Sequence, residues 1–346
     1  MKQISLKELL QSYHRVVDVH GDIHTLVSGV EFDSRRIQPG NLFIAINGTA
    51  VDGHSFIPQV ISAGAIAIVC EILPESLVEG VCYVVVESSA SACGYIASQY
   101  YGNPSSKLIL TGVTGTNGKT TTATLLYEMA RLCGYKAGLL STVCNYIDDK
   151  PIPATQTTPD PLSINRMLAE MVDAGCKYAF MEVSSHAAVQ CRIDGLTFKC
   201  GIFTNLTRDH LDYHKTTQNY IAAKKRFFDL LPADAVALTN IDDANGNIMV
   251  QNTKARVYTY SMRSLADFRG KIIESRLDGT LLEINGKEVD VIFVGAFNAY
   301  NLLAVYGAAS LIGLPHDKLL VNLSLLVPVA GRFQIFQTPS KVSVVV

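Results

Sequence analysis

The sequence predicts an α/β protein with two main domains, the second a doubly wound parallel sheet that binds a phosphate group. Short apolar, strand-length runs alternate with amphipathic, helix-length stretches along most of the chain, as in folds whose parallel strands are covered by helices on both faces. The stretch "LILTGVTGTNGKTTTATLLYEMA", residues 108–130, places a glycine-bounded loop with one lysine between such a strand and such a helix. The 346 residues also exceed what a single hydrophobic core usually supports.

Composition and charge exclude several classes of protein. With 48% apolar and 17% charged residues, the chain is globular. A net charge of -2 argues against a nucleic-acid partner, because neutralising phosphates requires clustered Lys and Arg. The N-terminus has scattered charges, unlike a signal peptide, and no apolar run reaches the ~20 residues that span a bilayer. Eight cysteines without a C-x-x-C pair indicate reduced core residues of a cytoplasmic protein with no membrane partner.

Turn signals and strand patterns indicate where the domains lie. The first domain is predicted over residues 1–105, with turns at "QPGN" and "NGTAVDGH". The segment "YYGNPSSK" concentrates Gly, Asn, Pro and Ser, which indicates a domain boundary. The second domain is predicted to span 106–336. Its candidate strands are nearly all apolar, and ligands are expected at their carboxyl ends. These strands are "KLILTGV", "KAGLLST", "KYAFMEVSS", "KCGIFTN" and "DAVALTN".

The last predicted elements are a helix and a strand, followed by an apolar run. The stretch "FNAYNLLAVYGAASLIGL" predicts a helix, and "VPVAGRFQIF" predicts a loop that enters a strand. The chain then stops at "SKVSVVV", a β-branched run with no turn after it. Such a run is an unusual end for a globular protein, because residues 342–346 would be an apolar strand whose backbone groups are unpaired.

The loop "TGTNGKTTT" predicts phosphate binding, although it departs from the common pattern G-x-x-x-x-G-K-[ST]. Val113 stands where that pattern requires glycine, and Gly112 is one step out of register. The N–H groups of a tight loop at a helix N-terminus favour an anion. Lys119 would add positive charge against the β- and γ-phosphates, and the Thr120 hydroxyl would ligate Mg²⁺. The alternative is a simple glycine turn with a solvated lysine.

A second candidate site residue follows another predicted strand. Glu182, in "FMEVSSHAAVQCR", lies directly after the apolar strand "YAFM". This position places its carboxylate at the same sheet edge as Lys119. A carboxylate beside a phosphate needs a cation between them, so Glu182 is a candidate Mg²⁺ ligand. An acid in solvent or in a salt bridge is the alternative.

Two further segments contain candidate metal ligands. The stretch "IFTNLTRDHLDYH" crowds acidic, basic and imidazole side chains after a strand, and one imidazole could reach a second metal while others are structural. These side chains are Arg208, Asp209, His210, Asp212 and His214.

In "YIAAKKRFFDLL" the 3.6-residue repeat places Lys224 on the apolar face of a helix and turns Lys225 away. A buried, unpaired ammonium is costly, so Lys224 is expected to be neutralised, paired or modified. The alternative is a lysine at the edge of this apolar face, with its ammonium extended into solvent.

Taken together, "TGVTGTNGKTTT", "MEVSSHA", "FTNLTRDHLDYH", "YIAAKKRFF", "GAFNAYNLLA" and "PVAGRF" resemble the Mur ligases, the ATP-dependent amide-forming enzymes that build the peptide of bacterial peptidoglycan. The phosphate loop of that family is itself G-T-N-G-K-T, which accounts for Val113. The N-terminal "FDSRRIQPGNLFIAINGTAVDGHSFI" is similar to the family's uridine-nucleotide domain. The pairing of "MEVSSHA" with "TRDHLDYH" is similar to the member that adds a diamino acid, meso-diaminopimelate or L-lysine, to UDP-N-acetylmuramoyl-L-alanyl-D-glutamate.

The resemblance implies roles for individual residues. The catalytic set would be Lys119, Glu182, His210 and Lys224. One Mg²⁺ would lie on Thr120 and Glu182, and a second metal on His210 and on Lys224 as an N6-carboxylysine. ATP would contact Gly115, Thr116, Asn117, Gly118, Lys119, Thr120, Thr121, Asn298, Asn301 and Arg332. The uridine nucleotide would contact Phe32, Ser34, Thr49, Ala50 and Val51, and the muramoyl peptide Thr157, Thr158, Ser184, Gln190 and Arg192.

The implied reaction is carboxylate activation through an acyl phosphate. Members of the family have a further domain that delivers the amino acid. The resemblance implies that residues 337–346 begin this domain, so the chain is expected to stop at its first strand and to be inactive alone. Two alternatives stay open: a folylpolyglutamate synthase-like ligase with another acceptor, and a non-catalytic nucleotide-binding module. "FDSRR" and "DGHSFI" favour a uridine nucleotide over a folate, and intact Glu182, His210 and Lys224 favour an enzyme.

Overall fold

Two compact units make up the protein, which we describe from a computed structural model. The first unit comprises residues 1–105, 159–169 and 190–196, and the second comprises the remainder. The first unit thus includes two short segments that the sequence analysis placed in the second domain. The structure describes residues 3–48, 51–207, 211–329, 331, 335–337 and 343–345.

The first unit is built around a five-stranded sheet in the order β2-β7-β6-β5-β4. Strands β4 to β7 are parallel, and β2 pairs with β7 in the antiparallel sense. The strands are β2 Val16–His20, β4 Gly29–Glu31, β5 Asn41–Ile44, β6 Ala67–Cys70 and β7 Cys82–Val86, with a separate pair of β1 Ile4–Ser5 and β3 Leu26–Val27. The helices are α1 Leu6–Leu9, η1 Ser34–Arg36, η2 Gly53–Phe56, α2 Ile57–Ser62, α3 Ser89–Tyr100 and η3 Pro104–Lys107, the last at the junction with the second unit.

Helices cover both faces of this first sheet. Leu6 of α1 and Ile96 of α3 belong to the core cluster on one face, and Val60 of α2 belongs to the cluster on the other. Because β4 to β7 are parallel, their carboxyl ends lie at one edge of the sheet. Phe32 and Ser34 follow β4 at that edge, which is where ligands bind in folds of this kind.

The second unit contains an eleven-stranded sheet in the order β11-β10-β9-β12-β8-β13-β14-β15-β16-β17-β18. Its centre, from β9 to β16, is parallel, so the predicted doubly wound α/β domain is confirmed. The five strands predicted from apolar runs are all present. They are β8 Ile109–Thr114, β9 Ala137–Leu140, β12 Tyr178–Glu182, β13 Cys200–Phe203 and β14 Val236–Asn240.

Antiparallel strands that the sequence analysis did not predict extend both ends of this sheet. They are β10 Cys144–Ile147 and β11 Lys150–Pro153 at one end, and β17 Thr280–Ile284 and β18 Lys287–Val291 at the other. The parallel strands β15 Arg256–Ser261 and β16 Phe268–Ser275, which join them to the centre, were not predicted either. Side chains of β17 alternate between buried and half-buried. A strand with one solvated face has this alternating pattern, which a search for continuous apolar runs does not detect.

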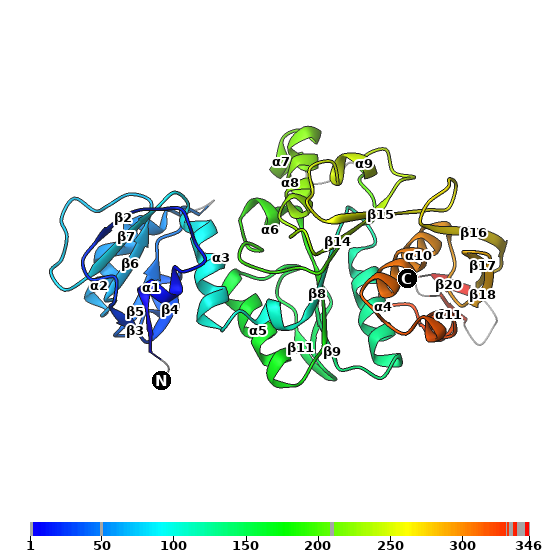
Figure 1. Cartoon of the computed structure of the whole chain (residues 1–346), viewed down its shortest axis with the longest axis horizontal. Coiled ribbons are helices and arrows are strands. Elements are labelled where there is room, and N and C mark those ends of the chain that lie inside the picture. The colour runs from blue at the N-terminus through cyan, green and yellow to red at the C-terminus, as the bar shows by residue number, and fades with distance from the viewer. Residues whose placement is uncertain are drawn as a thin grey trace. The chain divides into compact units, whose positions relative to one another are not determined.

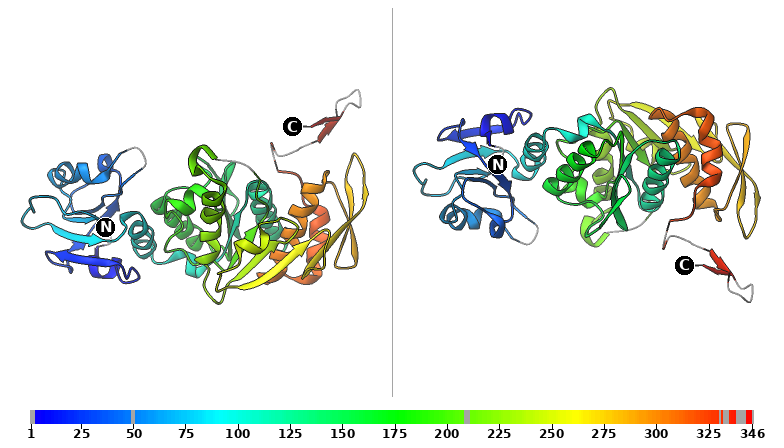
Figure 2. Two further views of the ribbon diagram at one scale, coloured as in Figure 1. Left: turned by 90° about the horizontal axis from the view of Figure 1, so that it is seen from above. Right: turned by 90° about the horizontal axis from the view of Figure 1, so that it is seen from below.

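Helices cover both faces of the central parallel strands (Figures 1 and 2). Val113 of β8 packs in one large core with α4 and α10, whereas Phe227 of α8 packs over Gly112 of the same strand on the opposite face. The helices of this unit are α4 Lys119–Leu132, α6 Ser185–Val189, α7 Leu211–His214, α8 Thr217–Asp229, α9 Gly246–Met249, α10 Ala296–Leu311 and α11 His316–Leu325. Helix α5, Pro161–Asp173, begins in the first unit and ends in the second. Among the described residues, no helix is both long and apolar enough to cross a membrane.

Near the C-terminus the structure corrects one expectation. Strand β20, Ser343–Val345, pairs in the antiparallel sense with β19, Ile335–Gln337. The backbone of these residues therefore has a partner within the chain, and the prediction of an unpaired strand is wrong for them. The partner is the preceding described strand, which the sequence analysis did not consider.

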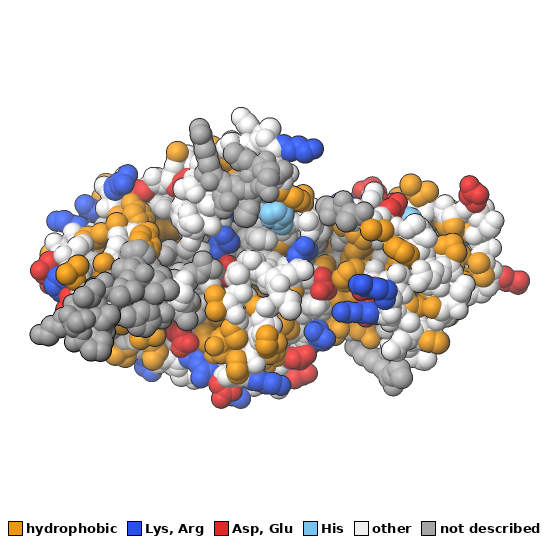
Figure 3. Space-filling view, turned by 180° about the vertical axis from the view of Figure 1, so that it is seen from behind, with side chains coloured by type: hydrophobic (Ala, Val, Ile, Leu, Met, Phe, Trp, Pro, Cys, Tyr) orange, Lys and Arg blue, Asp and Glu red, His pale blue; other side chains and the backbone are white. Residues whose placement is uncertain are grey.

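Most of the cysteines are buried, and charged side chains of both signs lie on the surface (Figure 3). All eight cysteines are free, and six of them are buried, as expected for reduced core residues. Burial raises the pKa of the Cys70 thiol to about 11, so this thiol stays protonated near neutral pH. On the face of the molecule in Figure 3, Lys and Arg side chains are interspersed with Asp and Glu side chains.

Candidate active site

The phosphate loop lies at the carboxyl end of β8, in the middle of the parallel sheet. The chain proceeds from β8 to strands on one side and later to strands on the other, so this is the switch point where ligands bind in such folds. Gly118 has a φ of 84° and caps α4 without a side-chain hydrogen bond. A Cβ atom there would overlap the side chain of Asn301, so glycine is required both for the backbone and for space.

Hydrogen bonds shape the loop and hold Lys119 over it. The Lys119 ammonium donates to the carbonyl oxygens of Gly115 at 3.0 Å and Thr116 at 2.8 Å. The segment after β13 supports the loop from behind, because the Thr116 N–H donates to the carbonyl of Asn205 at 2.8 Å. The Thr204 hydroxyl likewise donates to the Asn117 carbonyl at 2.6 Å. A cationic, preformed cradle for phosphate results.

Glu182 ends β12, the strand next to β8, and its side chain is buried. Its Oε1 atom accepts three hydrogen bonds: from the Thr120 hydroxyl at 2.9 Å, from the Thr142 N–H at 2.7 Å and from the Thr142 hydroxyl at 2.9 Å. Its Oε2 atom makes no hydrogen bond to any described residue. The sequence left open an acid in solvent or in a salt bridge; within the described residues this carboxylate makes no ion pair and lies among neutral donors.

The Thr120 hydroxyl and the Glu182 carboxylate suit a small divalent cation. Both are hard oxygen donors, they lie 2.9 Å apart, and both line the cavity beside the phosphate loop. Over the part of the chain that the structure describes, no three His, Cys, Asp or Glu side chains form a metal-binding group. Magnesium is commonly held by one or two protein ligands together with phosphate oxygens of the substrate, so this pair fits such a site.

Lys224 of α8 lies behind the phosphate loop. Its side chain is 1% exposed, its ammonium donates to the Gly115 carbonyl at 2.7 Å, and it lies 4.6 Å from the centre of the Tyr220 ring. The inward orientation predicted from the helical repeat is confirmed, and the alternative of a lysine extending into solvent is wrong. Lys225 points away and pairs with Asp229 at 2.6 Å.

The imidazole-rich segment after β13 is only partly described. Arg208, Asp209 and His210 lie outside the described residues, as does the side chain of Asp212. His214 is buried, with its Nε2 atom 2.9 Å from the Ser185 hydroxyl. This histidine joins α7 to α6 and therefore has a structural position.

A cavity of about 910 Å³ opens in front of these groups, along the carboxyl ends of the central strands. Each of six neighbouring strands contributes at least one residue at or just beyond its end. In sheet order these are β9, β12, β8, β13, β14 and β15. The lining residues are Thr116, Asn117, Gly118, Lys119, Thr120, Thr121, Thr142, Thr157, Glu182, Thr204, Asn205, Asn240, Asp242, Asp243, Tyr260, Arg263, Phe297, Asn298, Tyr300, Asn301 and Gly331.

One group of lining residues was missed by the sequence analysis. Asp242 accepts hydrogen bonds from the Ser261 hydroxyl at 2.6 Å, the Met262 N–H at 2.8 Å and the Tyr300 hydroxyl at 2.8 Å. It thereby joins the end of β15 to α10, the helix that presents Asn298 to the cavity. Asp242 follows the predicted strand "DAVALTN" almost directly, so the strand-end rule that selected Glu182 would also have found it.

The Asp242 and Tyr300 side chains perturb each other's protonation. Burial raises the pKa of Asp242, but hydrogen bonds from Ser261, Tyr300 and Met262 outweigh this effect and hold the pKa below its ordinary value of 3.8. Burial, together with the hydrogen bond to Asp242, raises the pKa of Tyr300 to about 12. The pair therefore consists of a carboxylate and a neutral phenol over the whole physiological range.

The residues predicted for the uridine substrate are divided between the two units. Thr157, Thr158 and Ser184 belong to the second unit, where the Thr158 hydroxyl donates to the Glu182 carbonyl at 2.8 Å and accepts from the Ser184 N–H at 3.1 Å. Those in the first unit are Phe32, Ser34, Val51, Gln190 and Arg192, the last two joined at 2.6 Å. Thr49, Ala50 and Arg332 lie outside the described residues.

The fold and the site define a nucleotide-binding α/β protein with a phosphate loop at its switch point, and comparison with known families agrees. The family model described as "Mur ligase middle domain" matches residues 113–309, and the model described as "Mur ligase family, catalytic domain" matches residues 26–101. The chain belongs to the Mur ligase family.

Within this family the chain is similar to one kind of ligase in particular. A UDP-N-acetylmuramoyl-L-alanyl-D-glutamate--2,6-diaminopimelate ligase of Bacteroides thetaiotaomicron is 57% identical over 341 residues, which are 99% of this chain and 70% of that protein. A solved structure of a ligase of the same name has a TM-score of 0.83 at 25% identity, over 97% of this chain and 69% of that one. A MurF ligase of Thermotoga maritima in complex with ADP shares the fold, with a TM-score of 0.60 at 20% identity over 90% of this chain and 68% of that one.

Proposed function

We propose that the protein acts as an ATP-dependent ligase that adds 2,6-diaminopimelate to UDP-N-acetylmuramoyl-L-alanyl-D-glutamate in peptidoglycan biosynthesis, releasing ADP and phosphate. The main support is the preformed phosphate loop, which opens on a 910 Å³ cavity with Glu182 at the same sheet edge. The names of the similar ligases support the acceptor and favour diaminopimelate over L-lysine. They also favour this acceptor over that of a folylpolyglutamate synthase.

The chemistry requires two anions, the γ-phosphate of ATP and the D-glutamyl carboxylate, to approach each other. A carboxylate oxygen attacks the γ-phosphorus, ADP leaves, and an acyl phosphate forms; the amine of the amino acid then attacks the acyl carbon and phosphate leaves. Lys119 and the N–H groups of the loop would orient the phosphates and offset their charge. A Mg²⁺ ion on Thr120 and Glu182 would supply further positive charge beside the transferred group.

Lys224 is proposed to act as a carbamate. Its amine would attack CO₂ and lose a proton, which gives an N-carboxylated side chain with one negative charge. The carbamate nitrogen keeps one hydrogen, so the 2.7 Å hydrogen bond to the Gly115 carbonyl can persist. The burial of Lys224 behind the phosphate loop supports this proposal, because an anion there can assist in holding a cation whereas an ammonium cannot. The second metal would also need His210.

The uridine nucleotide is proposed to bind the first unit. Phe32, Ser34 and Val51 follow the parallel strands β4 and β5 of that unit, at the edge where nucleotides bind in such sheets. The muramoyl peptide would then contact Thr157, Thr158, Ser184, Gln190 and Arg192. Under this proposal ATP and the uridine nucleotide depend on different units of the protein.

This division gives the experiment that tests the proposed function. In the Lys119→Ala variant, calorimetry should detect no binding of Mg-ATP, because the cationic cradle is lost, while the affinity for UDP-N-acetylmuramoyl-L-alanyl-D-glutamate stays within about threefold of wild type. Lys271→Ala, which changes an exposed lysine of β16, is the matched control and should bind both ligands normally. Loss of both affinities in a folded Lys119→Ala protein would contradict the division, and a wild-type protein that binds neither ligand would refute the function.

A further inference from the structure

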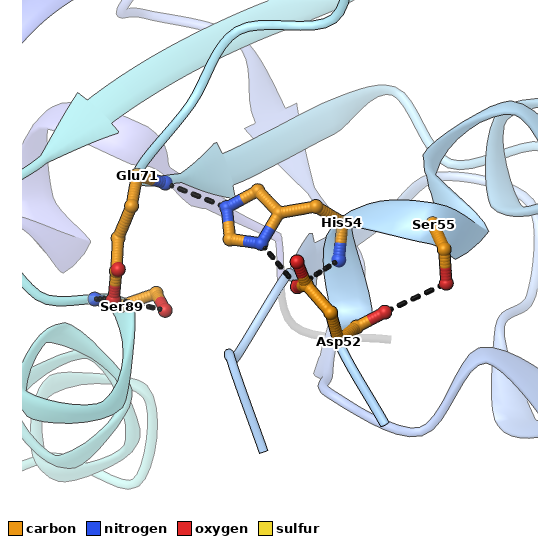
Figure 4. A network of polar contacts seen from close by, with 5 residues as sticks. All are labelled: Asp52, His54, Ser55, Glu71 and Ser89. Carbon is orange, nitrogen blue, oxygen red and sulfur yellow. Dashed lines mark hydrogen bonds and ion pairs between the residues drawn. The ribbon is translucent and has the colours of Figure 1, made fainter. Parts of the chain in front are cut away.

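A chain of hydrogen bonds crosses the carboxyl edge of the sheet in the first unit (Figure 4). The His54 Nδ1 atom lies 2.7 Å from a carboxylate oxygen of Asp52, and the Nε2 atom of the same ring accepts the backbone N–H of Glu71 at 2.9 Å. The Glu71 carboxylate in turn accepts the N–H and the hydroxyl of Ser89, at 2.8 and 2.9 Å. These four residues are called the His54 chain below.

The partners of His54 decide which ring nitrogen has the proton. The Glu71 N–H can only donate, so Nε2 must offer a lone pair. The Asp52 carboxylate can only accept while it is ionised, and hydrogen bonds from His54 lower the pKa of Asp52. The ring is therefore neutral, with its hydrogen on Nδ1. A second proton would place an N–H group at Nε2 directly against the Glu71 N–H.

The His54 chain joins three segments that are far apart in sequence. Asp52 and His54 close the loop after β5, which is also held by the bond from the Gly53 N–H to the Ile46 carbonyl at 2.9 Å. Glu71 directly follows β6, and Ser89 begins α3. The Asp52–His54 bond is local, because its ends are two positions apart, whereas the ends of the His54–Glu71 and Glu71–Ser89 bonds are 17 and 18 positions apart.

We propose that His54 is a positioning residue for the uridine-nucleotide site, because its Nε2 atom ties the loop that contains Val51 to the end of β6. The inference rests on the proposed function of the first unit. Val51 is 56% exposed on this loop and is among the residues proposed to contact the nucleotide. The side chain of His54 itself is only 14% exposed and does not need to touch the ligand. The charged groups facing the ring are the Asp52 carboxylate, from its own segment, and Glu71, whose carboxylate is turned to Ser89.

Two amide variants separate the two hydrogen bonds of the ring. In His54→Gln the amide oxygen can reach the former position of Nε2 and accept from the Glu71 N–H. In His54→Asn the shorter side chain can only retain the local bond to Asp52. We therefore expect His54→Gln to bind UDP-N-acetylmuramoyl-L-alanyl-D-glutamate within about threefold of wild type, and His54→Asn and His54→Ala to bind about tenfold more weakly, the effect of losing one buried hydrogen bond.

Calorimetry on the full chain gives these affinities, and urea denaturation shows whether the first unit of each variant is folded. The affinity for Mg-ATP should stay unchanged, because it depends on the second unit. A ¹⁵N spectrum of histidine-labelled wild type should show His54 with a protonated Nδ1 and an unprotonated Nε2. Equal affinities for Gln, Asn and Ala variants, or the opposite tautomer, would overturn the inference while leaving the proposed function intact. A wild-type protein that does not bind the uridine substrate would overturn both.

Discussion

Glu182 offers the sharpest test of the site, because two substitutions separate its structural role from its proposed cation-binding role. Glu182→Ala removes the acceptor of three hydrogen bonds from Thr120 and Thr142. Losing a hydrogen bond to a charged group costs roughly 1.5–3 kcal/mol of stability when water cannot replace the lost acceptor. Here the donors face a cavity of about 910 Å³, and water can replace the carboxylate. We therefore expect a total loss of about 2–3 kcal/mol, which lowers the melting temperature by roughly 4–12 °C in a domain of this size.

Glu182→Gln is the matched variant. Its amide oxygen can occupy the position of Oε1 and keep all three hydrogen bonds, while the amide nitrogen replaces Oε2, which makes no hydrogen bond to a described residue. We expect its free energy of unfolding to stay within about 1 kcal/mol of wild type. Its affinity for ATP in the presence of Mg²⁺ should fall at least about tenfold, because one anionic ligand of the cation is lost, whereas its affinity for ATP without Mg²⁺ should not fall.

Denaturation monitored by circular dichroism and calorimetry with and without Mg²⁺ measure these quantities. Equal unfolding free energies for the Ala variant and wild type would refute the energetic argument. Unchanged Mg²⁺-dependent ATP binding in Glu182→Gln would refute the role of the carboxylate in holding the cation.

Two further predictions concern the same unit. The intact mass of the protein under CO₂ should increase by one CO₂ in wild type and in Lys225→Ala but not in Lys224→Ala. In a chain that also contains the family's amino-acid-delivering domain, a short-chain carboxylic acid should restore ligase activity to Lys224→Ala, and wild-type activity of that variant would contradict the role of the carbamate. Tyr300→Phe should destabilise the protein by on the order of 1 kcal/mol at pH 7. The folded pKa of Asp242 lies below 3.8, so the stability that this carboxylate contributes is present above pH 3.8 and is lost as the pH falls. In urea denaturation, the difference in unfolding free energy between wild type and Tyr300→Phe should therefore decrease below pH 3.8. The pKa of Tyr300 is raised to about 12, so the same difference in unfolding free energy should also decrease as the pH rises from 10.0 through 12. A difference that stays constant at all these pH values would contradict the coupling of Asp242 and Tyr300.

The central sheet and the phosphate loop could be predicted because each is encoded locally. Strands buried on both faces must be apolar along their whole length, so β8, β9, β12, β13 and β14 appear as uninterrupted runs. A loop that brings several N–H groups to one point needs glycine at fixed places, so Gly118 and Lys119 identify it. The membership of the Mur ligase family, predicted from this loop and five other motifs, is confirmed.

The periodicity of a single helix also gave the burial of Lys224, since the side-chain direction on a helix follows from the 3.6-residue repeat alone. Its partner could not be predicted in the same way. The Gly115 carbonyl lies 109 residues away in sequence, and only the packing of α8 beneath the phosphate loop brings the two together.

The same limit applies to the polar contacts that give each site its chemistry. By itself the sequence determined the class of fold, the loop that cradles phosphate and which strand ends would meet at one edge, because these depend on residue type, spacing and period. Only the tertiary structure decided that Glu182 faces Thr142, that Asp242 joins β15 to Tyr300, and that His54 is a neutral acceptor for Glu71. Hydrogen bonds require their atoms within a few tenths of an ångström and in line, and such distances between remote segments are set by the packing of the whole core rather than by any local pattern.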